Sequence, residues 1–293
     1  MDVNEDFGKL RRMIITKRLE ELDVIGYLTK ISKFRKLNRK KISDGQLFSE
    51  MMSLFSVDNK VTLLPITVPF KKDYLFYRIR NLGKEYALNQ LKIQDFWSPP
   101  DHMIKNYGRI NKPKESILYT SLSIDGCLEE ISLNNEDIFL IMQYKTKRDI
   151  KATQIGGDLN INTLNLESNK AEGNYAIINN FINEEFSREV GIGTEHLYKT
   201  SELIAKSFFD LPPEWQDAWT FPSIQEKSNM NIAFRKKTAE EILNLNSVLV
   251  CKHDENHKGR LSIYLVFNNF EDDQFDVIQP GTDKYIKFMN SYV

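Results

Sequence analysis

The sequence predicts a protein of the α+β class, built from mixed sheets with helices attached to them. Helix-like periodicity dominates only the beginning of the chain, and strand-like runs become frequent after residue 74. The later helices and strands alternate irregularly, and the sequence contains no internal repeat. A regular alternation would indicate a doubly wound parallel sheet, so the irregular order favours the α+β class.

Residues 1–60 are expected to form a helical N-terminal extension. One helix, over residues 46–55, has a cap available at Ser43 or Asp44. Before it, apolar side chains recur at near-helical spacing at Leu10, Ile14, Leu22 and Ile25. Such an extension can act as a regulator, as a dimer element or as an arm that binds a target.

The middle of this extension, residues 30–41, is strongly basic. Its cationic residues are Lys30, Lys33, Arg35, Lys36, Arg39, Lys40 and Lys41. One interpretation is a patch that binds nucleic acid or a protein partner. The other is a solvated helix face and loop. We favour the second, because the formal net charge of the whole chain is −1 and does not indicate a polyanionic ligand.

Residues 70–293 are expected to form the second, larger domain. It is preceded by an edge or irregular strand, because Pro65 and Pro69 interrupt that run. Ser123 is expected to cap a short helix, and the polar stretch 145–196 is interpreted as a long insertion of the kind that forms lids or disordered loops. Strands are predicted at 74–80, 117–121, 138–144, 219–225, 231–234, 247–253 and 260–269, and helices at 124–131, 201–211 and 238–246.

The composition is typical of a soluble protein of the cytoplasm. Hydrophobic residues make up 41% of the chain, and its only two cysteines, Cys127 and Cys251, are too few for a disulfide scaffold. The N-terminus lacks the apolar core of a signal peptide. The longest apolar run, 61–70, is too short and too interrupted by proline to cross a bilayer. We therefore expect no membrane association, and nucleic acid is not favoured as a partner.

Several common catalytic motifs are absent from the sequence. It contains no GxxxxGK[ST], no GxGxxG and no GxSxG motif. Cys251, His253 and His257 have a spacing compatible with zinc, but they lie in a charged turn without a fourth ligand nearby. We therefore predict neither a metal site nor a bound cofactor.

One group of polar residues does indicate chemistry. Arg109 follows Gly108, which permits close backbone approach, and Tyr119 and Ser121 point to one face of their strand. Arginine binds phosphates, a tyrosine ring stacks on a planar base, and a carboxylate stabilises an oxocarbenium-like transition state. A set of this kind would suit a dinucleotide pyrophosphate with a labile sugar bond, and its candidates are Arg78 and Arg80, Arg109, Tyr119, one of Glu129 and Glu130, and Ser223. On strands, arginines and tyrosines are also common in purely structural roles.

The order of five short motifs resembles that of the RES domain, a family named for its Arg, Glu and Ser residues. The motifs are FYRIR (76–80), YGRIN (107–111), ILYTS (117–121), LEEI (128–131) and WTFPSI (219–224), with Asn231 after them. The resemblance covers roughly residues 74–250. It implies a fold similar to that of ADP-ribosyltransferase toxins and an activity that consumes NAD+ as a substrate. Known members of the family are toxins of RES–Xre toxin–antitoxin pairs.

The resemblance also implies the roles of individual residues. The implied catalytic residues are Glu130, Arg109, Tyr119 and Ser223, and the implied NAD-binding residues are Arg78, Arg109, Tyr119 and Asn231. The arginines would hold the pyrophosphate or a ribose, and the tyrosine would line the nicotinamide end. Of two adjacent glutamates on the short helix, the register from Tyr119 selects Glu130 over Glu129.

The expected function is NAD+ degradation by cleavage of the nicotinamide–ribose bond, with water or phosphate as the acceptor. Such an enzyme would be a bacterial toxin of a toxin–antitoxin or defence system. Its expected partners are NAD+, phosphate and an Xre-type antitoxin, and a homodimer is compatible with the sequence. Two alternatives stay open. One is transfer of ADP-ribose to a protein, and the other is a non-catalytic binding protein that uses the basic segment 30–41.

Overall fold

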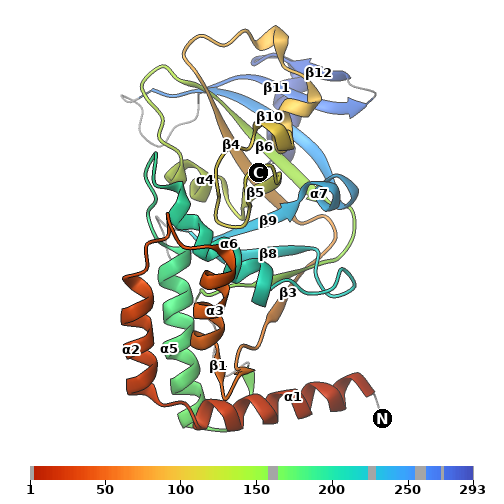
Figure 1. The fold of residues 1–293 in the computed structure, drawn as a ribbon. Coiled ribbons are helices and arrows are strands. Elements are labelled where there is room, and N and C mark those ends of the chain that lie inside the picture. The colour runs from red at the N-terminus through yellow and green to blue at the C-terminus, as the bar shows by residue number, and fades with distance from the viewer. Residues whose placement is uncertain (1–2, 158–163, 224–228, 255–261, 272–273, 293) are drawn as a thin grey trace.

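The fold is mixed α+β, as the sequence predicts (Figure 1). The computed structural model describes residues 3–157, 164–223, 229–254, 262–271 and 274–292. The α-helices in these residues are α1 Val3–Glu20, α2 Val24–Arg35, α3 Asp44–Leu54, α4 Ile124–Glu130, α5 Asn169–Phe186, α6 Tyr198–Phe208, α7 Lys236–Ile242 and α8 Asp283–Tyr292. The strands are β1 Ser56–Val57, β2 Lys60–Val61, β3 Ile66–Phe70, β4 Leu75–Gly83, β5 Ile117–Ser121, β6 Ile138–Thr146, β7 Ile150–Gln154, β8 Ala218–Pro222, β9 Met230–Arg235, β10 Leu243–Lys252, β11 Ser262–Glu271 and β12 Gln274–Ile278.

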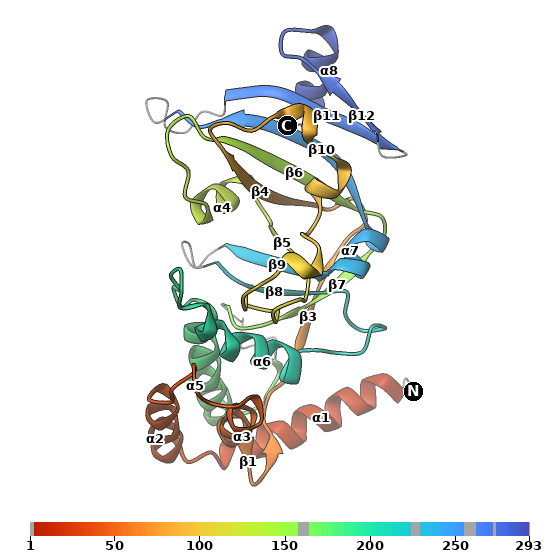
Figure 2. The same ribbon diagram turned by 45° about the horizontal axis from the view of Figure 1, so that its top comes forward.

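The large sheet consists of two parts that meet at a narrow joint. Its strand order in the described residues is β12-β11-β10-β6-β4-β5-β9-β8-β7-β3, and β4 pairs with β5 through the single register pair Tyr77 and Ser121. Figure 2 shows these two parts as two layers. The upper layer contains β12, β11, β10, β6 and β4, and the lower layer contains β9, β8, β7 and β3. The neighbouring strands are antiparallel except for β7 and β8, which are parallel. The joint therefore opens a space between the two layers.

The positions of two strands follow from their local sequences. Strand β6 is buried from Phe139 to Tyr144 and pairs with β4 on one side and β10 on the other. Strand β3 contains Pro69 and pairs only with β7, so it lies at the edge of the sheet. Proline removes a backbone donor and is tolerated at an edge, so the predicted edge strand is confirmed.

Residues 1–60 contain the helices α1, α2 and α3. Ser43 caps α3 by accepting a hydrogen bond from the backbone N–H of Gln46 (3.2 Å). In turn, the Gln46 side-chain oxygen accepts a hydrogen bond from the backbone N–H of Ser43 (3.3 Å). This capping box satisfies two backbone groups that the helix leaves unpaired. Figure 1 shows α2 beside α5, with α1 crossing at one end of the two helices.

The described apolar side chains of the extension share a core with the rest of the protein. Leu19 of α1 and Phe34 of α2 belong to one buried cluster with Phe181 of α5 and Trp219 of β8. The side chain of Asn174 in α5 also donates to the Leu19 carbonyl of α1 (2.7 Å). The N-terminal helices are therefore packed into the body of the protein through α5.

The stretch 145–196, expected as a loop-like insertion, contributes regular structure to the sheet and the core. It contains β7, which pairs with β3 and β8, and the long helix α5. The apolar side chains of α5 recur at helical spacing, but many polar residues lie between them. The high average polarity of the stretch therefore masks the helical period of its apolar residues in the sequence. The buried apolar set is Ala171, Tyr175, Ile178, Phe181, Ile182 and Phe186.

Two elements near the C-terminus are not anticipated by the sequence pattern. Strand β12 pairs with β11 at the end of the sheet, and α8 follows it. Tyr285 and Phe288 of α8 pack on the small cluster of Val266 and Ile278. In the part of the chain that the structure describes, no helix combines the length and the apolar character needed to cross a membrane.

Candidate active site

A cavity of about 790 Å³ lies at the joint between the two parts of the sheet. Its walls come from β4, β5, β8, β9, the loop before β5, and the helices α4 and α6. Pockets that bind small molecules usually have volumes of about 300–1,000 Å³. The sequence-predicted residues that line the cavity are Arg78, Arg109, Tyr119, Glu130 and Asn231.

Glu130 is the last residue of α4, and two buried side chains orient its carboxylate. Oε1 accepts one hydrogen bond from Ser223 Oγ and another from Asn231 Nδ2, each at 2.6 Å. Ser223 is only 1% exposed and Asn231 7%, whereas Glu130 itself is exposed. The carboxylate is therefore held in one direction while remaining accessible from the cavity. The neighbouring Glu129 is exposed and does not line the cavity.

Arg109 presents a guanidinium group whose two terminal nitrogens are buried and have no hydrogen-bond partner among the described residues. Both terminal nitrogens, Nη1 and Nη2, are inaccessible to solvent and unpaired. The guanidinium carbon lies 5.1 Å from the ring centroid of Tyr198. Burial lowers the pKa of Arg109, and Tyr198, Glu130 and Tyr119 oppose that shift electrostatically. A buried cation without an anion is costly, so this position would be stabilised by an anionic ligand.

Tyr119 anchors the loop that carries Arg109. Its hydroxyl accepts a hydrogen bond from the Ile110 backbone N–H (3.0 Å) and donates one to Asn111 Oδ1 (2.9 Å). Burial raises the pKa of this hydroxyl, and the ring packs edge-on against Phe221 at 6.4 Å between centroids. A Cβ at Gly108 would lie 2.2 Å from Asn111 Oδ1, so a larger residue at that position would displace the Asn111 side chain that binds Tyr119.

The two arginines of β4 differ in their surroundings. Arg78 lines the cavity and donates to the Trp97 carbonyl (3.0 Å), a neutral acceptor. Arg80, two residues along the strand, pairs with the Asp95 carboxylate at 3.2 Å. Arg78 therefore places a positive charge at the cavity, while the charge of Arg80 is neutralised locally.

The cavity also contains residues that the sequence motifs do not indicate. Tyr198 contacts Arg109 from α6, and no local sequence pattern indicates that these residues meet. Cys127 lines the cavity and donates to the Tyr77 carbonyl (3.3 Å). Burial, followed by the charge of Glu130, raises the pKa of Cys127 to about 12, which keeps the group a thiol at neutral pH.

The basic segment 30–41 is partly used for internal contacts. Arg39 is buried and donates to the carbonyls of Phe34 and Leu37. Arg35 pairs with Glu184 of α5. The segment therefore presents fewer unpaired cations than its composition suggests.

The described residues contain no group of three His, Cys, Asp or Glu side chains that could hold a metal ion. Of the weak zinc pattern considered from the sequence, Cys251 is buried in β10, and His257 lies outside the described residues.

Comparison of the chain with protein-family profiles, curated proteins and solved structures finds no match. The residues of the cavity therefore carry the functional argument by themselves. The structure brings the sequence-predicted site residues together. Five of them line the cavity, namely Arg78, Arg109, Tyr119, Glu130 and Asn231. The sixth, Ser223, reaches the site through its hydrogen bond to Glu130.

Proposed function

We propose that the protein is an NAD+-degrading enzyme that cleaves the nicotinamide–ribose bond in the cavity at the joint of the sheet. The observation that carries the proposal is a carboxylate oriented by two buried side chains in the same cavity as an unpaired, buried arginine. The order of the RES-like motifs also supports the proposed cleavage of NAD+. In this proposal the fold is similar to that of ADP-ribosyltransferase toxins.

Arg109 and Arg78 would bind the pyrophosphate of the dinucleotide. A guanidinium donates several hydrogen bonds in a fixed plane and suits phosphate oxygens. Arg109 has both terminal nitrogens unpaired, and Arg78 bonds to the Trp97 carbonyl and the Tyr144 hydroxyl, so neither charge is neutralised by a carboxylate of the described residues. Binding of the phosphates would satisfy the buried charge of Arg109.

Glu130 would stabilise the positive charge that develops on the ribose. As the bond between ribose C1′ and nicotinamide breaks, its electron pair leaves with nicotinamide and the sugar becomes oxocarbenium-like. A carboxylate already oriented by Ser223 and Asn231 stabilises that charge without reorganisation. Water then adds to C1′ and loses a proton, which gives ADP-ribose. Inorganic phosphate in the same position gives ADP-ribose 1″-phosphate.

Tyr119 would contribute its ring rather than its hydroxyl. The hydroxyl is already bound to Ile110 and Asn111 of the Arg109 loop, and burial raises its pKa. A phenol in that state is a poor general base at neutral pH. The proposed role of Tyr119 is therefore packing at the nicotinamide end of the cavity.

The test is nicotinamide release from NAD+ by the purified protein and by two variants of adjacent residues. Glu130→Ala is expected to lower the release rate by about 100-fold or more, because an oriented electrostatic stabiliser is lost. Glu129→Ala is the matched control and should retain the wild-type rate. Circular dichroism and thermal unfolding should show that both variants are folded. Full turnover by a folded Glu130→Ala, Arg109→Ala double variant would exclude this site.

The acceptor is decided by product analysis. Incubation with NAD+ and phosphate distinguishes hydrolysis from phosphorolysis through the mass of the ADP-ribose product. Transfer to a protein, the nearest alternative, would instead leave an ADP-ribose adduct on a protein of a cell lysate. In a host cell, NAD+ depletion and growth arrest that Glu130→Ala abolishes would support the role of a toxin, whose neutralising partner in this proposal is an Xre-type antitoxin.

A further inference from the structure

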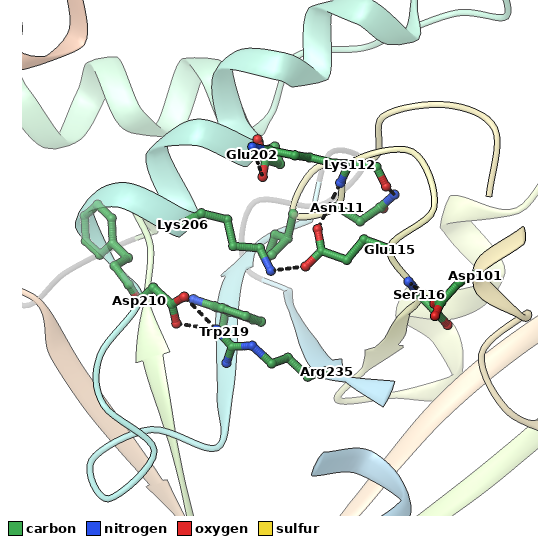
Figure 3. A network of polar contacts seen from close by, with 12 residues as sticks. Asp101, Asn111, Lys112, Glu115, Ser116, Glu202, Lys206, Asp210, Trp219 and Arg235 are labelled. Carbon is green, nitrogen blue, oxygen red and sulfur yellow. Dashed lines mark hydrogen bonds and ion pairs between the residues drawn. The ribbon is translucent and has the colours of Figure 1, made fainter. Parts of the chain in front are cut away.

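Helix α6 lies against the loop that carries Arg109 and contacts it at both ends. Near its C-terminal end, Lys206 pairs with Glu115 of the loop (Figure 3). In its middle, the Glu202 carboxylate lies 3.9 Å from Lys112 Nζ. Its first residue, Tyr198, lies beneath the Arg109 guanidinium at 5.1 Å. The loop is thus attached to one rigid element along its length.

The Tyr198 ring supports the Arg109 guanidinium from one side. Because Nη1 and Nη2 make no hydrogen bond in the described part of the chain, no carboxylate or carbonyl fixes their direction. A cation placed over an aromatic ring is attracted by the electron-rich face of that ring. The ring therefore orients the charge without neutralising it.

Helix α6 is in turn fixed by the N-terminal extension. Lys199 pairs with Asp44 at the start of α3 and donates to the Ile42 carbonyl, each at 2.7 Å. The rings of Phe48 in α3 and Phe208 in α6 lie 6.1 Å apart. These contacts connect the N-terminal helices to the cavity through α6.

We propose that Tyr198 is a positioning residue of the NAD+ site, which aims the Arg109 guanidinium at the dinucleotide phosphates, and that α6 connects this contact to the N-terminal extension. The inference rests on the proposed function for the identity of the ligand. It goes beyond that function because Tyr198 belongs to none of the motifs that suggested NAD+ chemistry. The extension then serves ligand binding as well as stability.

The first test compares the steady-state kinetics of Tyr198→Leu and Tyr198→Phe with NAD+ as substrate. Tyr198→Leu should raise KM by about 10-fold and change kcat by less than about 2-fold, because the interaction acts on binding in both ground and transition states. Tyr198→Phe keeps the ring and should restore a KM near that of the wild type. Tyr264→Leu, at an exposed tyrosine of β11, is the matched control. An unchanged KM in active Tyr198→Leu, or a fall in kcat alone, would overturn the proposal.

The second test does not depend on NAD+ turnover. Phenylglyoxal modifies accessible arginines, and peptide mass spectrometry gives the rate at Arg109 separately from other arginines. The rate should be at least about 5-fold higher in Tyr198→Leu than in the wild type and Tyr198→Phe, because the ring no longer holds the buried guanidinium. Equal rates would overturn the proposal. Absence of NAD+ turnover in the wild type would refute the proposed function, and the modification rates would then decide the positioning role of Tyr198 alone.

Discussion

Arg235 and Arg109 each lie on an aromatic ring, and they differ in what balances their charge. Arg235 lies 4.3 Å from the Trp219 ring and also binds both carboxylate oxygens of Asp210, at 2.5 and 2.6 Å (Figure 3). Arg109 lies over Tyr198 and has no carboxylate partner within hydrogen-bond distance in the described residues. A paired cation contributes to the fold, whereas a buried unpaired cation lowers stability unless a ligand supplies the missing anion. The comparison therefore separates structural charges from those available for binding.

The largest expected effect is on activity and comes from Arg109→Ala. We expect kcat/KM for NAD+ to fall by about 100-fold, or about 2.7 kcal/mol, because the phosphates lose a charged ligand. The free energy of unfolding should stay the same or increase, since the substitution removes an unpaired buried charge. Steady-state kinetics and urea unfolding give the two quantities. A large loss of stability would show that Arg109 is a structural residue.

Arg235→Ala is the matched counterpart and should show the opposite pattern. The ion pair with Asp210 is partly exposed, so its loss together with the contact on Trp219 should cost about 1 kcal/mol of stability. NAD+ turnover should stay near the wild-type rate. If Arg235→Ala reduced turnover without destabilising the protein, the distinction between the two arginines would be wrong.

The second effect concerns Glu202, which is 1% exposed and whose Oε1 accepts no hydrogen bond from the described residues. Burial raises the pKa of Glu202 from 4.5 to about 7, and Lys112 and Lys206 oppose that rise while Glu115 and Asp44 add to it. The folded state therefore binds this proton more tightly than the unfolded state, and stability falls as the pH rises from about 4.5 through about 7.

Glu202→Gln removes this titration and should change the pH dependence of stability. Between pH 5 and pH 8, the unfolding free energy of the variant should rise relative to the wild type by roughly 2–3 kcal/mol. Urea unfolding at the two pH values measures the difference. A constant difference between variant and wild type would mean that Glu202 is ionised in the folded state throughout this range.

A smaller effect than that of Glu202→Gln is expected for Tyr119→Phe, which removes a hydroxyl that pairs with two groups of the Arg109 loop. Loss of the bonds to Ile110 and Asn111 should lower the unfolding free energy by about 1–2 kcal/mol. KM for NAD+ should rise only a few-fold, because the ring and the Arg109 side chain remain. Unfolding and kinetic measurements on one preparation test both statements. A complete loss of turnover would indicate that the hydroxyl takes part in the reaction.

Several features of the fold could be predicted because their signals are local. Ser43 and Ser123 begin helices α3 and α4 because each accepts a hydrogen bond from a backbone N–H three residues ahead. Pro69 predicts an edge strand because it lacks a backbone donor. Helix α5 lies in the stretch interpreted as an insertion, because polar residues separate its buried apolar ones along the sequence. Only in the folded helix do these apolar side chains form one face, which packs into the shared core.

The candidate site shows the same division between local and long-range signals. The sequence motifs select Glu130 in preference to Glu129, and the structure places only Glu130 against Ser223, 93 positions away, and Asn231, 101 positions away. The contact between Arg109 and Tyr198 has no counterpart in any motif. It depends on how α6 packs against the loop, which many side chains decide together.

The sequence by itself determined the local elements, because helix caps, proline positions and apolar runs act over a few residues. It also supplied the residue types that suit a dinucleotide. Only the tertiary structure decided which charges are neutralised, because ion pairs such as Lys206 with Glu115 join distant segments. The unpaired state of Arg109 is a property of that packing, and it is the feature that most directly indicates an anionic ligand.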